Sequence, residues 1–217
     1  MRLRRSSLTQ LGLQLLAAAF LIPSLLPSEA QAQSRSRDNW QRVPDVIAAL
    51  AIGPGSRVAD VGAGDGYFVA FLAEEVGSTG HVFAVDVSER ALSNLRRLIE
   101  DERLENVEVV HGDYDDPKLP DSSLDAVLVV NAYHEMTEYE AMLAGMLKAL
   151  KPGGRLVMLD HIPSDVSESR RQQTRDHDIG IDIVQPELEA AGFQVIERHE
   201  AFVNNGRSRQ WMLVARK

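Results

Sequence analysis

Short apolar runs alternate with helical stretches along most of this chain, and that alternation limits the fold more than any other feature. Each run is apolar at nearly every position, which is typical of a strand buried on both faces. The expected strands are residues 57–63, 81–87, 107–111, 124–130 and 155–159. The expected helices, which have apolar residues at helical spacing, are residues 40–52, 67–76, 88–104 and 138–150. This order predicts an α/β fold with a parallel sheet covered by helices on both faces.

The end of the chain departs from this rhythm. Residues 193–203 and 209–216 both read as strands, and the linker between them contains Asn205-Gly206, a hairpin signal. The sheet is therefore expected to finish with an antiparallel pair. Earlier, Lys151-Pro-Gly-Gly154 predicts a sharp end to the helix over 138–150.

The first 32 residues have the pattern of a secretory signal peptide. A basic start with Arg2, Arg4 and Arg5 precedes a mostly apolar stretch over 11–26, and Ala30-Gln31-Ala32 resembles a cleavage site. The stretch is shorter than the ~20 residues that a membrane-spanning helix needs. The sequence thus predicts a signal peptide over 1–32, a flexible tether over 33–39 and one domain over 40–217. The expected location is periplasmic or secreted, with a membrane-anchored chain as the alternative.

Composition excludes several kinds of function. The chain contains no cysteine, so disulfides, thiolate metal sites and cysteine nucleophiles are ruled out. Its formal net charge is −9, and the basic residues of the first segment make the remainder more acidic still. Nucleic-acid binders normally present a basic face, so nucleic-acid binding is not expected. Stable membrane insertion of the mature chain is not expected either.

A glycine-rich loop follows the first strand. Gly62, Gly64 and Gly66 lie where that strand meets the next helix, and such loops let a ligand approach the backbone at the carboxyl end of a strand. The spacing is G-x-G-x-G, and Tyr67 occupies the position that a dinucleotide fingerprint reserves for its third glycine. The loop therefore predicts a ligand site but disfavours a nicotinamide or flavin dinucleotide.

Acidic residues end the next two strands. Asp86 could accept hydrogen bonds from both hydroxyl groups of a ribose. Asp113 could accept from an adenine amino group, with Tyr114 beside the ring. Each signal is weak alone, but in this order along the chain they together favour a ligand that contains adenosine.

Five segments in order carry a resemblance to a known family. VADVGAGDG, AVDVS, HGDYDD, LDAVLVVNAYHEM and LKPGGRLVMLD resemble the S-adenosylmethionine-dependent methyltransferases of the Rossmann-like class, over about residues 40–217. The resemblance implies a seven-stranded sheet of order 3-2-1-4-5-7-6 with strand 7 antiparallel, and S-adenosyl-L-methionine as cofactor. The NAYHEM segment further resembles a group of bacterial methyltransferases that often carry export signals.

The resemblance also implies roles for single residues. The loop would surround the methionine part of the cofactor, Asp86 would hold the ribose, and Val87, Asp113 and Tyr114 would meet the adenine. Asn131 would close the pocket at the end of the fourth strand. The loop residues implied are Asp60, Gly62, Ala63, Gly64 and Gly66.

The acceptor side is expected beyond the fourth and fifth strands. His134 is the first candidate for a general base, because its ordinary pKa suits proton removal near neutral pH. Glu135 could orient it or contact a basic acceptor, and Tyr133 could pack against the methyl group or hydrogen-bond the acceptor. His161 is a second candidate base. None of the familiar short metal-ligand spacings joins the histidines, so no metal site is predicted.

The charged stretch over 168–182, which contains His177-Asp178, reads as a solvated helical face, with a lid over the acceptor as the alternative.

Transfer of a methyl group to a small-molecule acceptor is the function these features favour. A non-catalytic exported module that binds an adenosyl ligand is the alternative, and a nicotinamide-dependent oxidoreductase is less favoured. Methylation of nucleic acid is opposed by the acidic charge and by the absence of the N-P-P-Y pattern after the fourth strand. The residues leave the attacked atom and the oligomeric state open.

Overall fold

The protein is an α/β sandwich built on one seven-stranded sheet, seen in a computed structural model that describes residues 41–206 and 208–217. The strands follow the order β3-β2-β1-β4-β5-β7-β6. They are β1 (Arg57–Val61), β2 (His81–Asp86), β3 (Val107–His111), β4 (Leu124–Val130), β5 (Leu150–His161), β6 (Gln194–Asn204) and β7 (Arg209–Arg216). The helices are α2 (Val43–Leu50), α3 (Tyr67–Val76), α4 (Glu89–Glu102), η1 (Tyr133–Glu135, a 3₁₀ turn), α5 (Tyr139–Ala149), α6 (Arg170–Arg175) and α7 (Ile181–Ala190).

The pairing of the strands confirms the predicted topology. The first five strands pair in parallel, whereas β7 runs antiparallel to both β5 and β6. All carboxyl ends of the parallel strands therefore meet at one edge of the sheet, which is where ligands bind in such folds.

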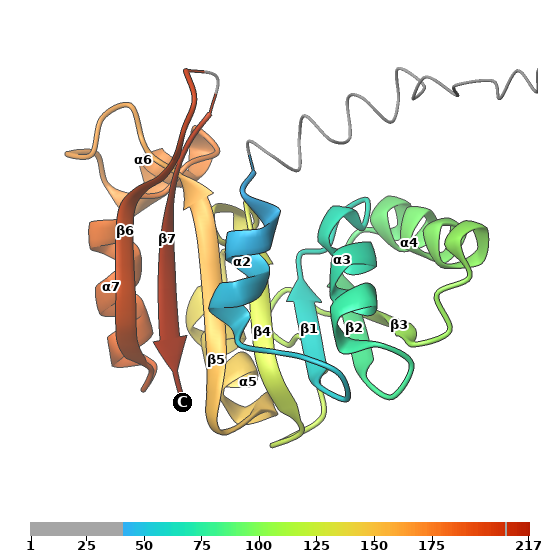
Figure 1. Cartoon of the computed structure of the whole chain (residues 1–217). Coiled ribbons are helices and arrows are strands. Elements are labelled where there is room, and N and C mark those ends of the chain that lie inside the picture. The colour runs from blue at the N-terminus through green and yellow to red at the C-terminus, as the bar shows by residue number, and fades with distance from the viewer. Residues whose placement is uncertain (1–40, 207) are drawn as a thin grey trace, which may run out of the picture.

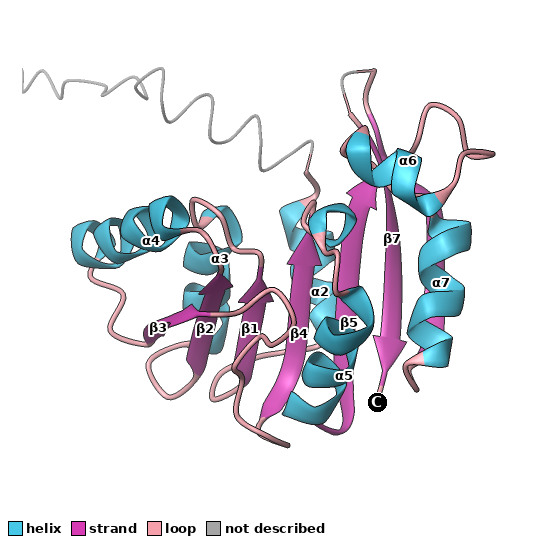
Figure 2. Ribbon diagram, turned by 180° about the vertical axis from the view of Figure 1, so that it is seen from behind, coloured by secondary structure: helices cyan, strands magenta, loops and turns pink. Residues whose placement is uncertain are grey.

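Two apolar cores lie on opposite faces of the sheet. Helices α2 and α3 lie over one face (Figure 1), and α5 lies over the other, with α6 and α7 beyond it (Figure 2). One core joins α5 and α7 to the sheet through residues such as Met146 and Leu188, and the other joins α2 and α3 through Val46 and Leu72. Burial on both faces explains why the parallel strands read as nearly continuous apolar runs.

The boundaries depart furthest from the sequence prediction at two places. Strand β5 begins at Leu150, so Lys151–Gly154 belong to an extended strand rather than to a turn that only ends a helix. Leu150 pairs with Leu124 at the start of β4, which continues the sheet into this segment. The stretch over 168–182 forms α6 and the start of α7, because the backbone turns at His177, whose φ is 58°.

The predicted signal peptide over 1–32 and tether over 33–39 lie outside the described residues. Within the described part of the chain, every helix is too short or too polar to span a membrane.

Candidate active site

Two adjoining cavities open at the carboxyl edge of the sheet. The larger measures about 420 Å³ and the smaller about 230 Å³. Gly62, Gly64 and Asn131 line both, so the glycine loop and the end of β4 form the wall between them. The larger cavity also contacts Asp86, Val87, Asp113, Tyr114 and Glu135, and the smaller contacts Asp60, Ala63 and Asp65.

The glycine loop is fixed by strand β2. The N–H groups of Gly62 and Ala63 both donate to the carbonyl oxygen of Val85, at 2.9 and 3.0 Å. The N–H of Gly64 donates to Oδ2 of Asp86 at 2.9 Å. These three donors are therefore occupied before any ligand arrives.

Asp86 is held from both sides. Its Oδ2 accepts from Gly64, and its Oδ1 accepts from the N–H of Ser88 at 2.9 Å. Each carboxylate oxygen has two lone pairs, so each retains the capacity to accept one hydroxyl group. The side chain is thus oriented at the cavity wall in a way that suits a ribose.

Asp60 is buried, only 3% exposed, and lines the smaller cavity. Burial, with a smaller contribution from the charge of Asp86, raises the pKa of Asp60 from 3.8 to about 7. Asp60 therefore changes charge near neutral pH.

Gly66 differs from the other loop residues that the resemblance implied, because it lines neither cavity. Its φ is 82°, and a Cβ atom there would lie 2.5 Å from Leu98 Cδ2 and 2.9 Å from Leu95 Cδ2. The structure thus places Gly66 where α3 packs against α4.

Asp113 and Tyr114 lie at the outer rim of the larger cavity. Asp113 Oδ2 pairs with Lys118 Nζ at 2.8 Å, and Tyr114 is 71% exposed. Gly112 lies between them and the sheet, and it lines the cavity although only its neighbours were singled out. These side chains can cover one end of a bound ligand.

A chain of amides orients Asn131. Its Oδ1 accepts from Gln210 Nε2 at 2.6 Å, and Gln210 Oε1 accepts from Gln41 Nε2 at 2.9 Å. Both glutamines are fully buried. Because its oxygen is engaged, Asn131 has its NH₂ group left to donate to a ligand.

His134 forms a buried pair with Asp160. Its Nδ1 donates to Asp160 Oδ1 at 2.8 Å, and its backbone N–H donates to Asp160 Oδ2 at 3.1 Å. Burial lowers the pKa of His134, but the hydrogen bond and charge of Asp160 outweigh it, so the pKa lies above its ordinary 6.5. Nε2 is thereby directed away from Asp160.

Tyr133 has a partner of its own. Its ring is fully buried, and its hydroxyl donates to Glu187 Oε2 at 2.7 Å. Burial, reinforced by Glu187, raises the pKa of Tyr133 above its usual range. Arg170 pairs with the other oxygen of Glu187 at 2.7 Å, so Tyr133 joins η1 to α6 and α7.

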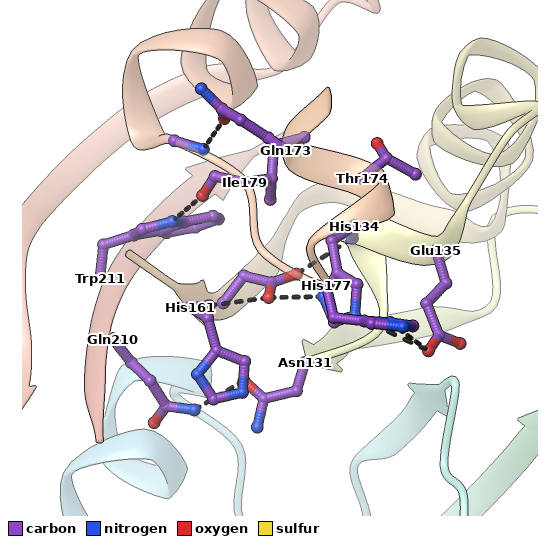
Figure 3. Close-up of polar contacts among 12 residues, drawn as sticks. Asn131, His134, Glu135, His161, Gln173, Thr174, His177, Ile179, Gln210 and Trp211 are labelled. Carbon is purple, nitrogen blue, oxygen red and sulfur yellow. Dashed lines mark hydrogen bonds and ion pairs between the residues drawn. The ribbon is translucent and has the colours of Figure 1, made fainter. Parts of the chain in front are cut away.

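Three polar side chains meet next to the larger cavity. Glu135, 66% exposed at its side chain, lies 3.7 Å from both His134 Nε2 and His177 Nδ1 (Figure 3). The ring centroid of His161 lies 6.4 Å from that of His134. The structure thus brings His177 to the acceptor side.

Sequence reasoning missed several residues of this site. It placed Asp160 on the acceptor side but did not pair it with His134, although an acidic residue at the end of an apolar strand was a usable signal. It also missed Met136 and Met142, which line the larger cavity and follow only from the path of the chain after β4.

Comparison with known proteins agrees with this geometry. Residues 58–154 match a family model described as a methyltransferase domain. Over 121 residues the chain is 32% identical to a demethylmenaquinone methyltransferase of Listeria welshimeri, covering 56% of this chain and 50% of the relative. Over 122 residues it is 34% identical to the ubiquinone/menaquinone biosynthesis C-methyltransferase UbiE of Ectopseudomonas mendocina, covering 56% and 47%. The chain therefore spans about half the length of these curated relatives.

A solved structure extends the likeness over most of the fold. The crystal structure of a SAM-dependent methyltransferase from Aquifex aeolicus superposes with a TM-score of 0.72 at 23% identity, covering 85% of this chain and 97% of the other. At this identity the likeness concerns the fold. Taken with the matched domain and the curated relatives, it supports a Rossmann-like, S-adenosylmethionine-dependent methyltransferase domain.

Proposed function

We propose that this protein transfers a methyl group from S-adenosylmethionine to a small molecule. The charge of the two cavities carries the proposal. Their charged lining residues are all acidic: Asp60, Asp65, Asp86, Asp113 and Glu135. Among the described residues that line them there is no Lys or Arg.

This charge distribution fits a cationic sulfonium cofactor. Pyrophosphates are commonly held by backbone N–H donors of such a loop and of the helix that follows it, but the N–H groups of the first three loop residues, 62–64, are engaged with Val85 and Asp86. Carboxylates instead accept from ribose hydroxyl and ammonium groups. The acidic cavities thus support the methyl donor over a nicotinamide dinucleotide.

Methyl transfer itself asks little of the protein. The cofactor supplies the leaving group, and the chain must align an acceptor with the methyl carbon and exclude water. Glu135 lines the cofactor cavity and contacts His134 behind it, so the acceptor would enter on this side. The named relatives are a demethylmenaquinone methyltransferase and a ubiquinone/menaquinone biosynthesis C-methyltransferase. The family match ends at residue 154, however, before α6 and α7. We therefore propose only a small-molecule acceptor.

Calorimetric titration with S-adenosylmethionine and S-adenosylhomocysteine tests the proposal. We expect micromolar binding that Asp86→Ala abolishes and that Asp101→Ala, on the exposed face of α4, leaves unchanged. Circular dichroism should show both variants folded. Absence of binding by the folded wild-type chain would rule the methyltransferase activity out. Binding without any turnover against a panel of acceptors would favour the non-catalytic module.

We also propose that residues 1–32 direct export and are removed after Ala32. The basic start, apolar stretch and small residues at 30 and 32 support this. Cell fractionation should find the chain outside the cytoplasm, and N-terminal sequencing should begin at Gln33. An Ala32→Arg variant should keep its first segment. A cytoplasmic wild-type chain that retains residues 1–32 would contradict the proposal.

A further inference from the structure

We propose that His134, Glu135 and His177 bind a divalent transition-metal ion such as Zn²⁺. One ligand atom from each, an imidazole nitrogen or a carboxylate oxygen, lies within 4.8 Å of the other two. Figure 3 shows the three side chains converging on one point beside η1. Two imidazoles and one carboxylate form a donor set that such ions prefer.

His134 is already oriented as a metal ligand. Metal-binding histidines usually donate their second ring nitrogen to a carboxylate, which fixes the tautomer and the ring plane. Asp160 plays that part here at 2.8 Å from Nδ1. The His134 side chain is only 5% exposed, yet its Nε2 makes no hydrogen bond to any described residue, since Glu135 Oε1 lies 3.7 Å away. In the neutral ring, whose proton is on Nδ1, the lone pair of Nε2 thus faces the cluster.

His177 reaches the cluster through an unusual backbone conformation. It follows the end of α6 with φ of 58°, a left-handed value at which glycine is the common choice. Its N–H donates to the carbonyl of Thr174 at 3.3 Å. The ring then stands edge-on to His134, with centroids 5.8 Å apart. This turn therefore directs the imidazole of His177 toward His134.

The spacing is close to that of a coordinated ion. Zinc lies about 2.0–2.1 Å from its nitrogen ligands, so tetrahedral ligand atoms stand about 3.4 Å apart. Glu135 and His177 are exposed, at 66% and 76% of their side chains, and both can rotate inward by the remaining ångström or so. His134 need not move, which makes it the fixed point of the site.

Three protein ligands leave one coordination position open, as in catalytic rather than structural zinc sites. Glu135 also lines the cofactor cavity, so an oxygen or nitrogen of a bound small molecule could fill that position. A nitrogen that holds a metal cannot also remove a proton. The metal site and the predicted general base are therefore alternatives for His134 Nε2, and metal binding decides between them.

Titration with Co²⁺ and Zn²⁺, on the tag-free chain and without cofactor, tests the inference. We expect one ion per chain, with visible Co²⁺ absorption bands typical of four or five ligands, and displacement of Co²⁺ by Zn²⁺. His177→Ala and Glu135→Ala should each weaken binding at least about tenfold. Both residues are exposed, so both variants should fold, which circular dichroism verifies.

His199→Ala is the matched control, because His199 is a half-exposed histidine 3.3 Å from Glu197 on β6, and it should bind like wild type. Equal metal affinity in wild type and His177→Ala would overturn the inference, as would an equal loss in His199→Ala. Cofactor titration in the presence of a chelator is read separately. Its failure would count against methyl transfer and leave the metal result standing.

Discussion

At the scale of single residues, the carboxyl group of Asp60 links the smaller cavity to the stability of the fold. Its pKa of about 7 exceeds the 3.8 of the unfolded chain, so the native state binds the proton more tightly. The contribution of Asp60 to native stability is therefore largest below about pH 4, falls as the pH rises to about 7, and is constant above. Asp60→Asn removes this loss.

As the pH rises from 4 to 8, the unfolding free energy of Asp60→Asn should therefore increase relative to that of wild type by up to about 4 kcal/mol. Denaturant unfolding at several pH values measures the difference. Asp101→Asn, exposed on α4, should run parallel to wild type. Parallel curves for Asp60→Asn would mean that Asp60 ionises freely in the native state.

Gln210 acts at the same scale through its neighbours. Gln210→Leu removes the hydrogen bonds to Asn131 and Gln41 and leaves buried polar groups unpaired, at about 1–3 kcal/mol of stability. Asn131 would then rotate, and the affinity for S-adenosylmethionine should fall about five- to tenfold. Calorimetry and thermal unfolding measure the two effects. Gln194→Leu, exposed on β6, should change neither. Loss of stability with full affinity would show that the cofactor does not use Asn131.

At the scale of elements, the packing of α3 against α4 depends on Gly66. Gly66→Ala forces a left-handed alanine and a contact of 2.5 Å with Leu98. The combined strain should lower stability by about 2–4 kcal/mol. Gly53→Ala, where an added Cβ meets nothing within 4 Å, is the control for thermal unfolding. If both variants melt like wild type, α4 must shift without cost.

The limits of a strand or helix were predictable where the local sequence alone sets them. Strands β3 and β4 and helix α3 begin and end as expected, because apolar runs and helical spacing set their limits. The start of β5 was not, since Lys151–Gly154 have turn composition and only pairing across the sheet extends them. The cavity residues on the glycine loop follow from the motif, whereas the contact of His134 with His177 depends on the backbone turn after α6.

At the scale of the whole molecule, the glycine loop and the acceptor side are supported by different packing. The glycine loop is fixed by β1 and β2. The loop that carries His177 is instead held by two separate sets of contacts. Gly180 N–H donates to Gln173 Oε1 at 2.7 Å, and Trp211 Nε1 donates to the carbonyl of Ile179 at 2.6 Å. The second set is the pair of contacts through which Glu187 joins Arg170 to Tyr133. The glycine loop and the acceptor side can therefore be weakened separately.

Glu187→Ala should loosen the acceptor side alone. Among the described residues, it removes the only carboxylate paired with Arg170, whose side chain is 20% exposed, and the acceptor of the buried Tyr133 hydroxyl, at about 3 kcal/mol of stability. Hydrogen–deuterium exchange should quicken across residues 162–180, while β1 and β2 keep their protection because none of their contacts changes. Glu189→Ala, exposed on the same helix, should leave both regions protected. Faster exchange in β1 and β2 as well would show that the whole fold opens as one unit. The acceptor side would then not unfold independently of the glycine loop.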